Sequence, residues 1–357
     1  MIKKYTFGLD MAKKSYKVCL NTIDDAQIIK VKASSTFDNS VSGFTKFWSW
    51  CQKHIKLQAD VCFILESTGN YHEKLAWFLY NKEQTIHIVL PNRAKAYLTS
   101  IGNKSKNDKM DARGLAHMGA VQKLTPWRPI SKQIYQLRSL TRHLEDLQNV
   151  RTSLINQKEQ ASHGMFEVKE VTSSINKTIK ALEKQIETCK KNIEDLIQKD
   201  KQLSKKTNYL TSIKGVATIT AAIVIAETNG FELITSIKQL TSYAGYDVRQ
   251  NQSGQMNGKT RISKKGNAHI RRAMHLPAFN MVRYHVKPFE SLYQRVYDRT
   301  NTKMKAYVAV QRKLLAIMYV LWKKEEFYQE SITDKITAES YETAALDGLG
   351  INQVLFQ

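Results

Sequence analysis

The first 125 residues alternate short apolar runs with amphipathic stretches. Three strand-like runs follow one another at residues 5–10, 16–22 and 27–33, and short polar turns such as Asp24-Asp25 separate them. Alternation with a period of two predicts β-strands. Because the turns are short, we expect the three strands to pair antiparallel.

A helical pattern comes next, over residues 41–55, with Phe44, Phe47, Trp48 and Cys51 on one face. An apolar run at 61–65, a helix at 71–81, a strand at 86–90 and a second helical segment complete this region. The order βββαβαβα resembles the ribonuclease-H-like α/β fold, in which the first and fourth strands are parallel neighbours. Residues at the carboxyl ends of neighbouring parallel strands share one crevice.

Proline placement divides the rest of the chain. After Pro126 and Pro129 the next proline is Pro277, so the stretch between them is free to form long helices. Over residues 131–205 apolar side chains recur with a three-four spacing, at Leu137, Leu140, Leu144, Leu147, Leu154, Ile175, Ile179, Leu182, Ile186, Cys189, Ile193 and Leu196. With a reversal at His163-Gly164, this predicts two antiparallel coiled-coil helices, and we interpret them as a dimerisation region.

Four regions follow from these patterns. We expect a ribonuclease-H-like catalytic domain at residues 1–125, the coiled coil at 131–205 and a mainly helical domain at 206–330. The tail at 331–357 carries no usable motif. No apolar run approaches the ~20 residues that span a membrane, and the N-terminus leads directly into a strand pattern, so a cytoplasmic location is expected.

The charge of the chain points to a nucleic-acid partner. Lys and Arg number 55 against 32 Asp and Glu, a formal net charge of +23. Such an excess favours binding to phosphate backbones through the release of counterions. A basic, soluble surface without a specific partner is the alternative.

Soft metal ligands are poorly placed. The cysteines Cys19, Cys51, Cys62 and Cys189 are widely scattered, and the histidines form no closely spaced pair. Both patterns argue against a zinc site. The scattered cysteines are interpreted as reduced thiols that pack in the core. Oxygen ligands remain as the candidates.

Four acidic residues stand out in this basic chain. Asp10 and Glu66 end apolar β-like runs, and Asp108 and Asp111 lie three apart at a predicted helix start. Carboxylates gathered in one crevice repel one another unless cations neutralise them, so the set predicts two Mg²⁺ ions that bridge a scissile phosphate. A simpler reading makes Asp108 a helix N-cap and Asp111 a favourable first-turn acid.

Residues 210–222 read as a helix, a tight turn at Lys214-Gly215 and an alanine-rich helix. This pattern resembles a helix-hairpin-helix element, whose turn amides can hold a DNA phosphate. Because any two-helix hairpin can place a glycine there, the signal is not specific.

A single serine, Ser253, lies in the glycine-flanked loop Gln252-Ser253-Gly254. Basic residues surround it in the sequence, namely Arg249, Lys259, Arg261, Lys264, Lys265, Arg271 and Arg272. These cations could hold phosphate oxygens and stabilise a phosphoryl-transfer transition state. From composition alone, a turn serine beside a solvated basic surface is the better account.

The whole chain resembles the DEDD transposases of the Piv/MooV invertase-like insertion-sequence family (insertion-sequence family one-hundred-and-ten), which includes bridge-RNA-guided recombinases. The motifs that carry the resemblance are Gly8-Leu9-Asp10, Glu66-Ser67-Thr68-Gly69-Asn70-Tyr71, Pro91-Asn92, Asp108-Lys109-Met110-Asp111-Ala112, Gly215-Val216, Tyr243-Ala244-Gly245, Gln252-Ser253-Gly254 and Gly266-Asn267-Ala268-His269-Ile270-Arg271-Arg272. Tyr246 and Val248 depart from the leucine and proline usual in the family. Neither departure removes a reactive group.

The resemblance implies an acidic tetrad of Asp10, Glu66, Asp108 and Asp111 that binds Mg²⁺, with Ser253 as the nucleophile that becomes linked to a DNA strand. It also implies a structured guide RNA that pairs with double-stranded target and donor DNA, and a Holliday-junction-like intermediate. From the coiled coil we expect a homodimer, and we expect it to assemble to a tetramer on DNA, in the prokaryotic nucleoid. We hypothesise a composite site shared between subunits, because the tetrad and Ser253 lie in different predicted domains.

Two other classes stay open. One is a Holliday-junction resolvase or related nuclease that uses the tetrad with water and leaves Ser253 structural. The other is a non-catalytic RNA- or DNA-binding scaffold.

The chain lacks a GxxxxGK[ST] loop, so no ATP-driven step is expected.

Overall fold

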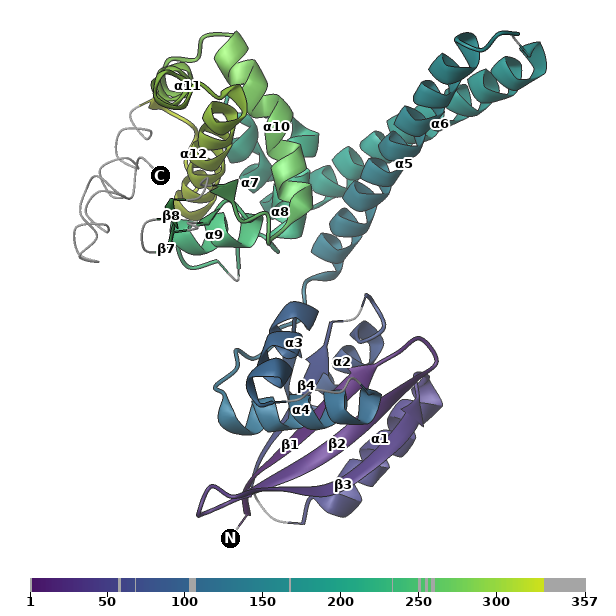
Figure 1. The fold of residues 1–357 in the computed structure, drawn as a ribbon, viewed down its shortest axis with the longest axis vertical. Coiled ribbons are helices and arrows are strands. Elements are labelled where there is room, and N and C mark those ends of the chain that lie inside the picture. The colour runs from purple at the N-terminus through teal and green to yellow at the C-terminus, as the bar shows by residue number, and fades with distance from the viewer. Residues whose placement is uncertain are drawn as a thin grey trace. The chain divides into compact units, whose positions relative to one another are not determined.

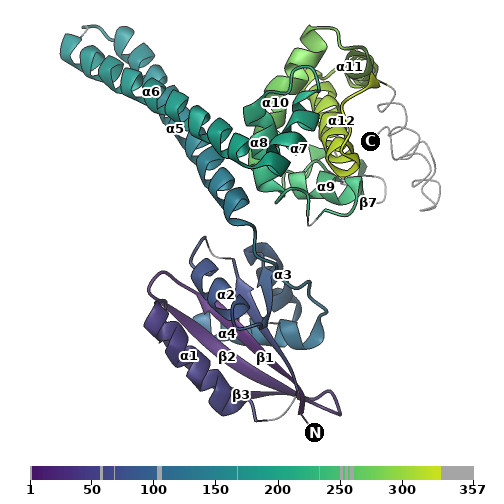
Figure 2. The same ribbon diagram turned by 180° about the vertical axis from the view of Figure 1, so that it is seen from behind.

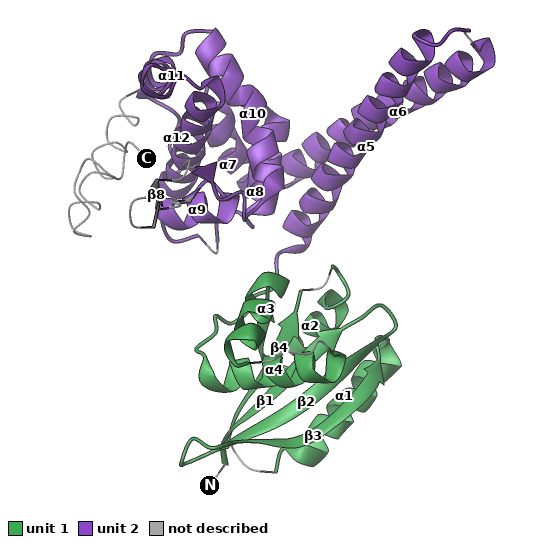
Figure 3. Cartoon of the chain, in the orientation of Figure 1, with its two compact units in different colours: residues 1–129 green, residues 130–357 purple. Residues whose placement is uncertain are grey.

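The computed structural model describes residues 2–56, 59–67, 69–102, 107–166, 168–232, 234–249, 252–253, 256–257 and 261–330. The chain forms two compact units, residues 1–129 and 130–357 (Figure 3). The first unit ends within a few residues of the boundary that the sequence predicts. The two long helices belong to the same unit as the C-terminal helices, and their assignment to a separate domain stays a prediction.

A five-stranded mixed sheet forms the centre of the first unit, in the order β3-β2-β1-β4-β5. Strands β1 (Ile2–Met11), β2 (Ser15–Asp24) and β3 (Ile29–Asp38) pair antiparallel, as the short turns predict. Strand β4 (Asp60–Glu66) runs parallel to β1, and β5 (Thr85–Val89) runs parallel to β4. The predicted parallel pairing of the first and fourth strands is confirmed, and this strand order is that of a ribonuclease-H-like sheet.

Successive side chains of β1 alternate between the two faces of the sheet, and a different set of helices covers each face. Tyr5, Phe7, Leu9 and Met11 are buried on one face, where α1 (Val41–His54) and α2 (Glu73–Tyr80) supply Phe44, Phe47, Cys51, Leu75 and Leu79. Successive side chains of a strand point to opposite faces. The other face, covered by α4 (Asp108–Val121), therefore receives the even-numbered positions of β1. Figure 1 shows α4 across this face, and Figure 2, seen from behind, shows α1 across the opposite face.

Gly8 lets α4 approach β1 closely. A Cβ atom at Gly8 would overlap the Ala112 carbonyl oxygen and the backbone of Ala116. Two even-numbered side chains of β1 then fasten the helix, since Lys4 Nζ donates to the Gly119 carbonyl at 2.7 Å and Thr6 Oγ1 donates to the Ala116 carbonyl at 2.9 Å. Helix α3 (Pro91–Ser100) packs beside α4.

The second unit is mainly helical. Helices α5 (Lys132–Ser162) and α6 (Lys169–Lys199) are the two long helices that the apolar spacing predicts. They pack along Leu137, Leu144, Ile186, Cys189 and Ile193. The remaining helices are α7 (Lys201–Thr211), α8 (Thr218–Glu227), α9 (Ile237–Ala244), α10 (Ala268–Arg283), α11 (Lys287–Thr300) and α12 (Lys303–Lys324). The buried side chains of α12 lie in the same apolar core as those of α8 and α10.

A short β-ribbon connects α9 to α10. Strand β6 (Val248–Arg249) pairs antiparallel with β9 (Arg261–Ile262), and between them β7 (Gln252–Ser253) pairs with β8 (Met256–Asn257). We call residues 248–262 the serine hairpin. Among the residues that the structure describes, no helix is long and apolar enough to cross a membrane.

Candidate metal centre and serine hairpin

Asp10 and Glu66 lie on the face of the sheet that α4 covers. Leu9 of β1 stands opposite Leu65 of β4 in parallel register, and both leucines are buried on the opposite face, toward α1 and α2. The next residue on each strand points the other way. The fold therefore brings Asp10 and Glu66 to one edge of the sheet, as the sequence predicts.

Asp108 and Asp111 occupy the first turn of α4. The N-cap is Asn107, whose Oδ1 accepts hydrogen bonds from the backbone N–H groups of Lys109 at 2.7 Å and Met110 at 3.4 Å. The reading of Asp108 as the cap is therefore wrong. With the capping done by Asn107, the Asp108 carboxylate is available to face the sheet, where the Lys17 ammonium lies 3.1 Å from its Oδ2 atom.

The four carboxylates share one electrostatic environment. The pKa of Asp10 is raised to about 6, first by burial and then by the negative charges of Glu66, Asp111 and Asp108, while Lys17 opposes the rise. Like charges that face one another disfavour ionisation. A divalent cation would relieve this repulsion, and carboxylate oxygens are the ligands that hard cations prefer.

The acids do not form a finished coordination sphere. Within the described part of the chain, no three His, Cys, Asp or Glu side chains converge closely enough to hold a metal ion as they stand. Magnesium sites in enzymes of phosphoryl transfer use one or two carboxylates, with waters and substrate phosphates as the other ligands. The residues fit that kind of open site.

Lys17 is a part of this centre that the sequence analysis missed. It stands opposite Asp10 in the antiparallel register of β1 and β2. A two-residue shift in the pairing of β1 with β2 would keep the Lys17 side chain on the same face but place it opposite a different residue, and the alternation of apolar and polar positions does not exclude such a shift. The signal that could have found it is a lysine at an otherwise apolar position on the strand that follows Asp10.

Ser253 lies in β7, and its backbone pairs with Met256. The structure describes only the backbone of Ser253 and of Arg249, and Lys259 lies outside the described residues. Three other predicted cations, Arg261, Lys264 and Lys265, are exposed at or just after the end of the serine hairpin. Their nucleic-acid contacts stay a prediction.

Arg271 and Arg272 make contacts within the protein. Arg271 Nη1 donates to the Ala244 carbonyl at 2.7 Å. Arg272 Nη1 donates to Glu145 Oε1 at 2.9 Å and to Asn149 Oδ1 at 2.7 Å, both on α5. As arranged here, these two guanidinium groups hold α10 against α9 and α5, and a role in binding nucleic acid would have to share or replace those bonds.

The turn between α7 and α8 contains the glycine that the sequence places there, and its role in binding phosphate stays a prediction. Gly215 has a φ of +91°, a backbone conformation that favours glycine, and Lys214 beside it is exposed. The N-cap of α8, Ala217, supplies no side-chain hydrogen bond to the first turn. The N–H groups of that turn can thus receive an anion.

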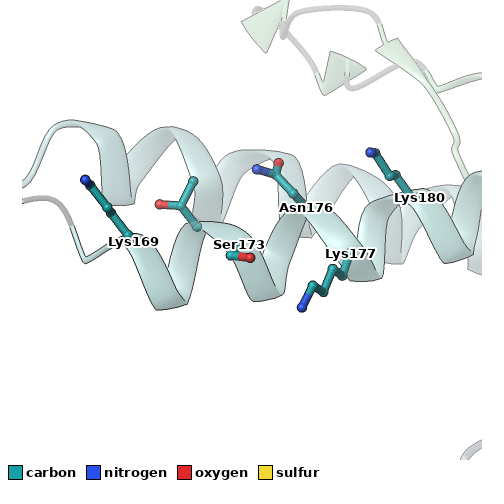
Figure 4. Close-up of a pocket in the computed structure, with 6 residues that line it drawn as sticks. Lys169, Ser173, Asn176, Lys177 and Lys180 are labelled. Carbon is teal, nitrogen blue, oxygen red and sulfur yellow. The ribbon is translucent and has the colours of Figure 1, made fainter.

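Helix α6 carries a basic outer surface. A shallow hollow along it is lined by Lys169, Thr172, Ser173, Asn176, Lys177 and Lys180, and Figure 4 shows these side chains spread along one helix. The lining has three lysines and no acid, so it attracts anions. It contains none of the tetrad residues and does not include Ser253.

Comparison with known proteins establishes the class and the family. Residues 7–167 match a family model for DEDD transposases described as "Transposase", and residues 207–294 match one described as "Transposase IS116/IS110/IS902 family". Together the matches cover more than half of the chain and define a DNA-cleaving recombinase. The chain belongs to the IS116/IS110/IS902 family of transposases.

Two relatives match along nearly their whole length. The chain is 29% identical over 336 residues to the "Pilin gene-inverting protein" of Moraxella lacunata, covering 93% of this chain and 99% of the relative. It is 28% identical over 333 residues to the "Pilin gene-inverting protein" of Moraxella bovis, with the same coverage.

Two solved structures resemble part of the chain. The RuvC structure of Thermus thermophilus covers 34% of this chain and 99% of its own, at 10% identity and a TM-score of 0.26. The fowlpox virus Holliday junction resolvase covers 33% and 99%, at 19% identity and a TM-score of 0.25. Because both scores are low, the assignment of the fold follows instead from the strand order and register of the sheet.

Proposed function

We propose that this transposase is an Mg²⁺-dependent, RNA-guided DNA recombinase that cleaves and rejoins target and donor strands through a phosphoserine at Ser253. The observation that carries the metal-dependent part is the raised pKa of Asp10, which burial and the charges of Glu66, Asp111 and Asp108 produce together. Acidic residues with only a structural role would be more stable if each lay beside basic residues and apart from other acids. The four carboxylates are instead concentrated where β1, β4 and α4 meet.

Asp10, Glu66, Asp108 and Asp111 would hold the Mg²⁺ ions. When bound, divalent ions neutralise a scissile phosphodiester and favour the ionised form of an attacking or leaving oxygen. Lys17 places a positive charge beside Asp108. It balances part of the acidic charge and orients that carboxylate before DNA arrives.

Ser253 would supply the attacking oxygen. The bond from its Oγ atom to phosphorus forms while one P–O bond of the DNA backbone breaks, and the Ser253 proton leaves to a base or to water. Attack by the released DNA oxygen of another strand reverses these changes and frees the serine. The number of P–O bonds is conserved, so strand exchange through a Holliday-junction-like intermediate needs no ATP.

We propose that subunits share the reaction. The tetrad belongs to the first unit and Ser253 to the second, yet both must act on one phosphodiester. The α5–α6 hairpin ends in exposed apolar side chains, Met165 at 91% and Phe166 at 79% exposure, which favour self-association. A homodimer, assembling to a tetramer on DNA, supplies the two halves of each site.

Guidance by a structured RNA is supported by the charge of the chain. A net charge of +23 favours the binding of nucleic-acid phosphates, and lysines line a hollow along α6, which lies outside the sequence segment that carries the tetrad. Base pairing by the RNA would read target and donor sequences, while the protein holds phosphates. The curated relatives are named for inverting a pilin gene, so the reaction of this chain is either transposition or inversion.

One observation favours a second function. The four carboxylates are coupled within the first unit without any contribution from Ser253. A Holliday-junction resolvase-type nuclease would need only these acids and water. It would release free 5′-phosphate ends and form no covalent protein–DNA adduct.

Cleavage of branched DNA in Mg²⁺, with EDTA as the blank, tests the metal-dependent part. Asp10→Asn should abolish cleavage and weaken Mg²⁺ binding measured by calorimetry. Asp60→Asn is the matched control, because Asp60 is an exposed acid at the other end of β4. Equal cleavage by wild type and Asp10→Asn would remove the tetrad from the reaction.

A further inference from the structure

The serine hairpin is too small to hold its own position. Its two pairs of two-residue strands lie between α9 and α10. An isolated two-stranded hairpin is marginally stable at best in water. The position of β7, which carries Ser253, therefore depends on what fixes the base of the hairpin.

Both ends of the hairpin are tied together at that base. The Asn267 N–H donates to the Tyr243 carbonyl at 2.8 Å, and the Lys264 N–H donates to the Gly245 carbonyl at 3.1 Å. Gly245 has a φ of +75°, and a Cβ atom at Gly266 would lie 2.5 Å from the Gly245 nitrogen and the Tyr243 oxygen. Two glycines thus permit a close approach that no larger residue would allow.

A buried glutamate lies directly behind this base. Glu227 is the last residue of α8, and its side chain is 1% exposed. Arg142 of α5 binds it with both arms, from Nε to Oε1 at 2.8 Å and from Nη2 to Oε2 at 3.0 Å. Burial alone would raise the pKa of Glu227, but hydrogen bonds from Arg142 and Asn267 outweigh it and lower the pKa, so the carboxylate is charged.

Glu227 contacts the chain on each side of the hairpin. Asn267 Nδ2, just after the hairpin, donates to Glu227 Oε2 at 2.6 Å. The Tyr243 hydroxyl, just before the hairpin, donates to the Glu227 carbonyl at 2.7 Å. Through Arg142, the same residue is bound to α5, so one glutamate links both ends of the hairpin to the long helix.

We propose that Glu227 is a positioning residue for the reaction at Ser253. With Arg142, Asn267 and Tyr243 it forms a clamp that fixes the base of the serine hairpin to α5. A charged carboxylate suits this task, because three directed hydrogen bonds from Arg142 and Asn267 set its geometry. The inference rests on the proposed role of Ser253, and it adds that the long helical hairpin determines where the serine is presented.

The least disruptive test is Tyr243→Phe, which removes the hydroxyl group and keeps the aromatic ring and its packing contacts. Tyr319→Phe is the matched control, because its hydroxyl also donates to a carbonyl, that of Ile234 at 3.2 Å, and neither residue belongs to the hairpin or contacts Glu227 through that hydroxyl. Asn267→Ser is the second variant. It retains a side chain able to cap α10 but is too short to reach Glu227.

The rate of covalent adduct formation at saturating DNA, the DNA affinity and the melting temperature are measured together for the full chain. We expect Tyr243→Phe and Asn267→Ser to lower the adduct rate about tenfold or more, since small misplacements of reacting groups are costly. DNA affinity should stay within about twofold, and the melting temperature of Tyr243→Phe should match that of Tyr319→Phe, which keeps the wild-type rate. A purely structural residue would lower all three quantities in parallel.

An exchanged pair gives a rescue. In the double variant Glu227→Gln/Asn267→Asp, the amide at residue 227 donates and the carboxylate at residue 267 accepts, the reverse of the wild-type hydrogen bond. The double variant should recover part of the adduct-formation rate that either single variant loses. Hydrogen exchange of peptides spanning residues 246–266 should be faster in each single variant and near wild type in Tyr319→Phe.

The outcomes separate the two claims. An absence of any adduct in the wild type overturns the role of Ser253, and the clamp with it. Adduct formation at wild-type rate in Tyr243→Phe and Asn267→Ser, with unchanged hydrogen exchange in the hairpin, overturns the clamp and leaves the role of Ser253 intact.

Discussion

Asp10 is the residue whose ionisation reports on the acidic centre. Its pKa rises from 3.8 to about 6 in the folded chain. A carboxyl with a raised pKa binds its proton more tightly when folded, so its contribution to stability is full below about pH 3.8 and is lost as the pH rises through about 6. At neutral pH, without divalent ions, the acidic centre opposes folding.

Replacing Asp10 should therefore stabilise the protein where the carboxylate is charged. In metal-free buffer at pH 7.5, Asp10→Asn should raise the melting temperature by roughly 2–4 °C, allowing for solvent screening. The difference should shrink at pH 4 and should also vanish when Mg²⁺ is added to the wild type. If Asp10→Asn lowers the melting temperature, or leaves it unchanged at both pH values, the four acids are not coupled as described.

The sequence predicts the position of some functional residues and not of others. The neighbourhood of Asp10 and Glu66 is predictable, because both end apolar strands that a ribonuclease-H-like sheet places side by side. The contact of Lys17 with Asp108 needs the register between β1 and β2, which alternation alone leaves open. The bond between Glu227 and Asn267 joins residues 40 positions apart, and the sequence shows only one acid at the end of an apolar helix.

Among the elements, α4 has the most direct bearing on the metal centre, because its first turn carries Asp108 and Asp111. Asn107→Ala removes the side-chain cap of that turn and should cost about 1 kcal/mol of unfolding free energy. It should also reduce the rise in melting temperature that Mg²⁺ produces, since both carboxylates lie on the frayed turn.

Ser131→Ala is the control for that change, because the Ser131 hydroxyl caps α5 by accepting from Ile134 at 3.2 Å. It should cost a similar free energy and leave the Mg²⁺ effect unchanged. An equal loss of the Mg²⁺ effect in both variants would mean that the first turn of α4 has no particular role in binding the ion.

Elements with clear periodicity are the ones that the sequence predicts well. The strands of the first unit, α1 and the two long helices follow from spacings of two and of three to four residues. The serine hairpin does not, because strands of two residues leave no periodic pattern. The close packing of α4 on β1 depends on Gly8 meeting Ala112, and no local pattern connects segments that far apart.

At the scale of the whole molecule, charge should govern the affinity for nucleic acid. Substituting Lys169, Lys177 and Lys180 of α6 with Gln should weaken RNA binding and reduce the slope of log affinity against log salt by about 0.7–0.9 for each lost phosphate contact. Lys190→Gln is the control, because that lysine already pairs with Glu187 at 2.7 Å. An unchanged slope in the triple variant would place the RNA elsewhere.

The division of the reaction between subunits predicts complementation. Asp10→Ala and Ser253→Ala should each be inactive alone, and a mixture of the two should recover part of the recombination activity, because one subunit supplies the acids and another the serine. Recombination between plasmid-borne sites, followed by sequencing of the junctions, measures this. Persistent inactivity of mixtures that still form mixed oligomers would mean that each subunit acts alone.

The covalent intermediate is the most direct test of the central claim, that this transposase both cuts and rejoins DNA. Wild-type protein, guide RNA and labelled DNA in Mg²⁺ are resolved on a denaturing gel, beside Ser253→Ala. We predict a DNA-linked protein band that requires Mg²⁺ and is absent from Ser253→Ala, which still binds RNA. An adduct that persists in Ser253→Ala, or free 5′-phosphate ends with no adduct in the wild type, would contradict the account.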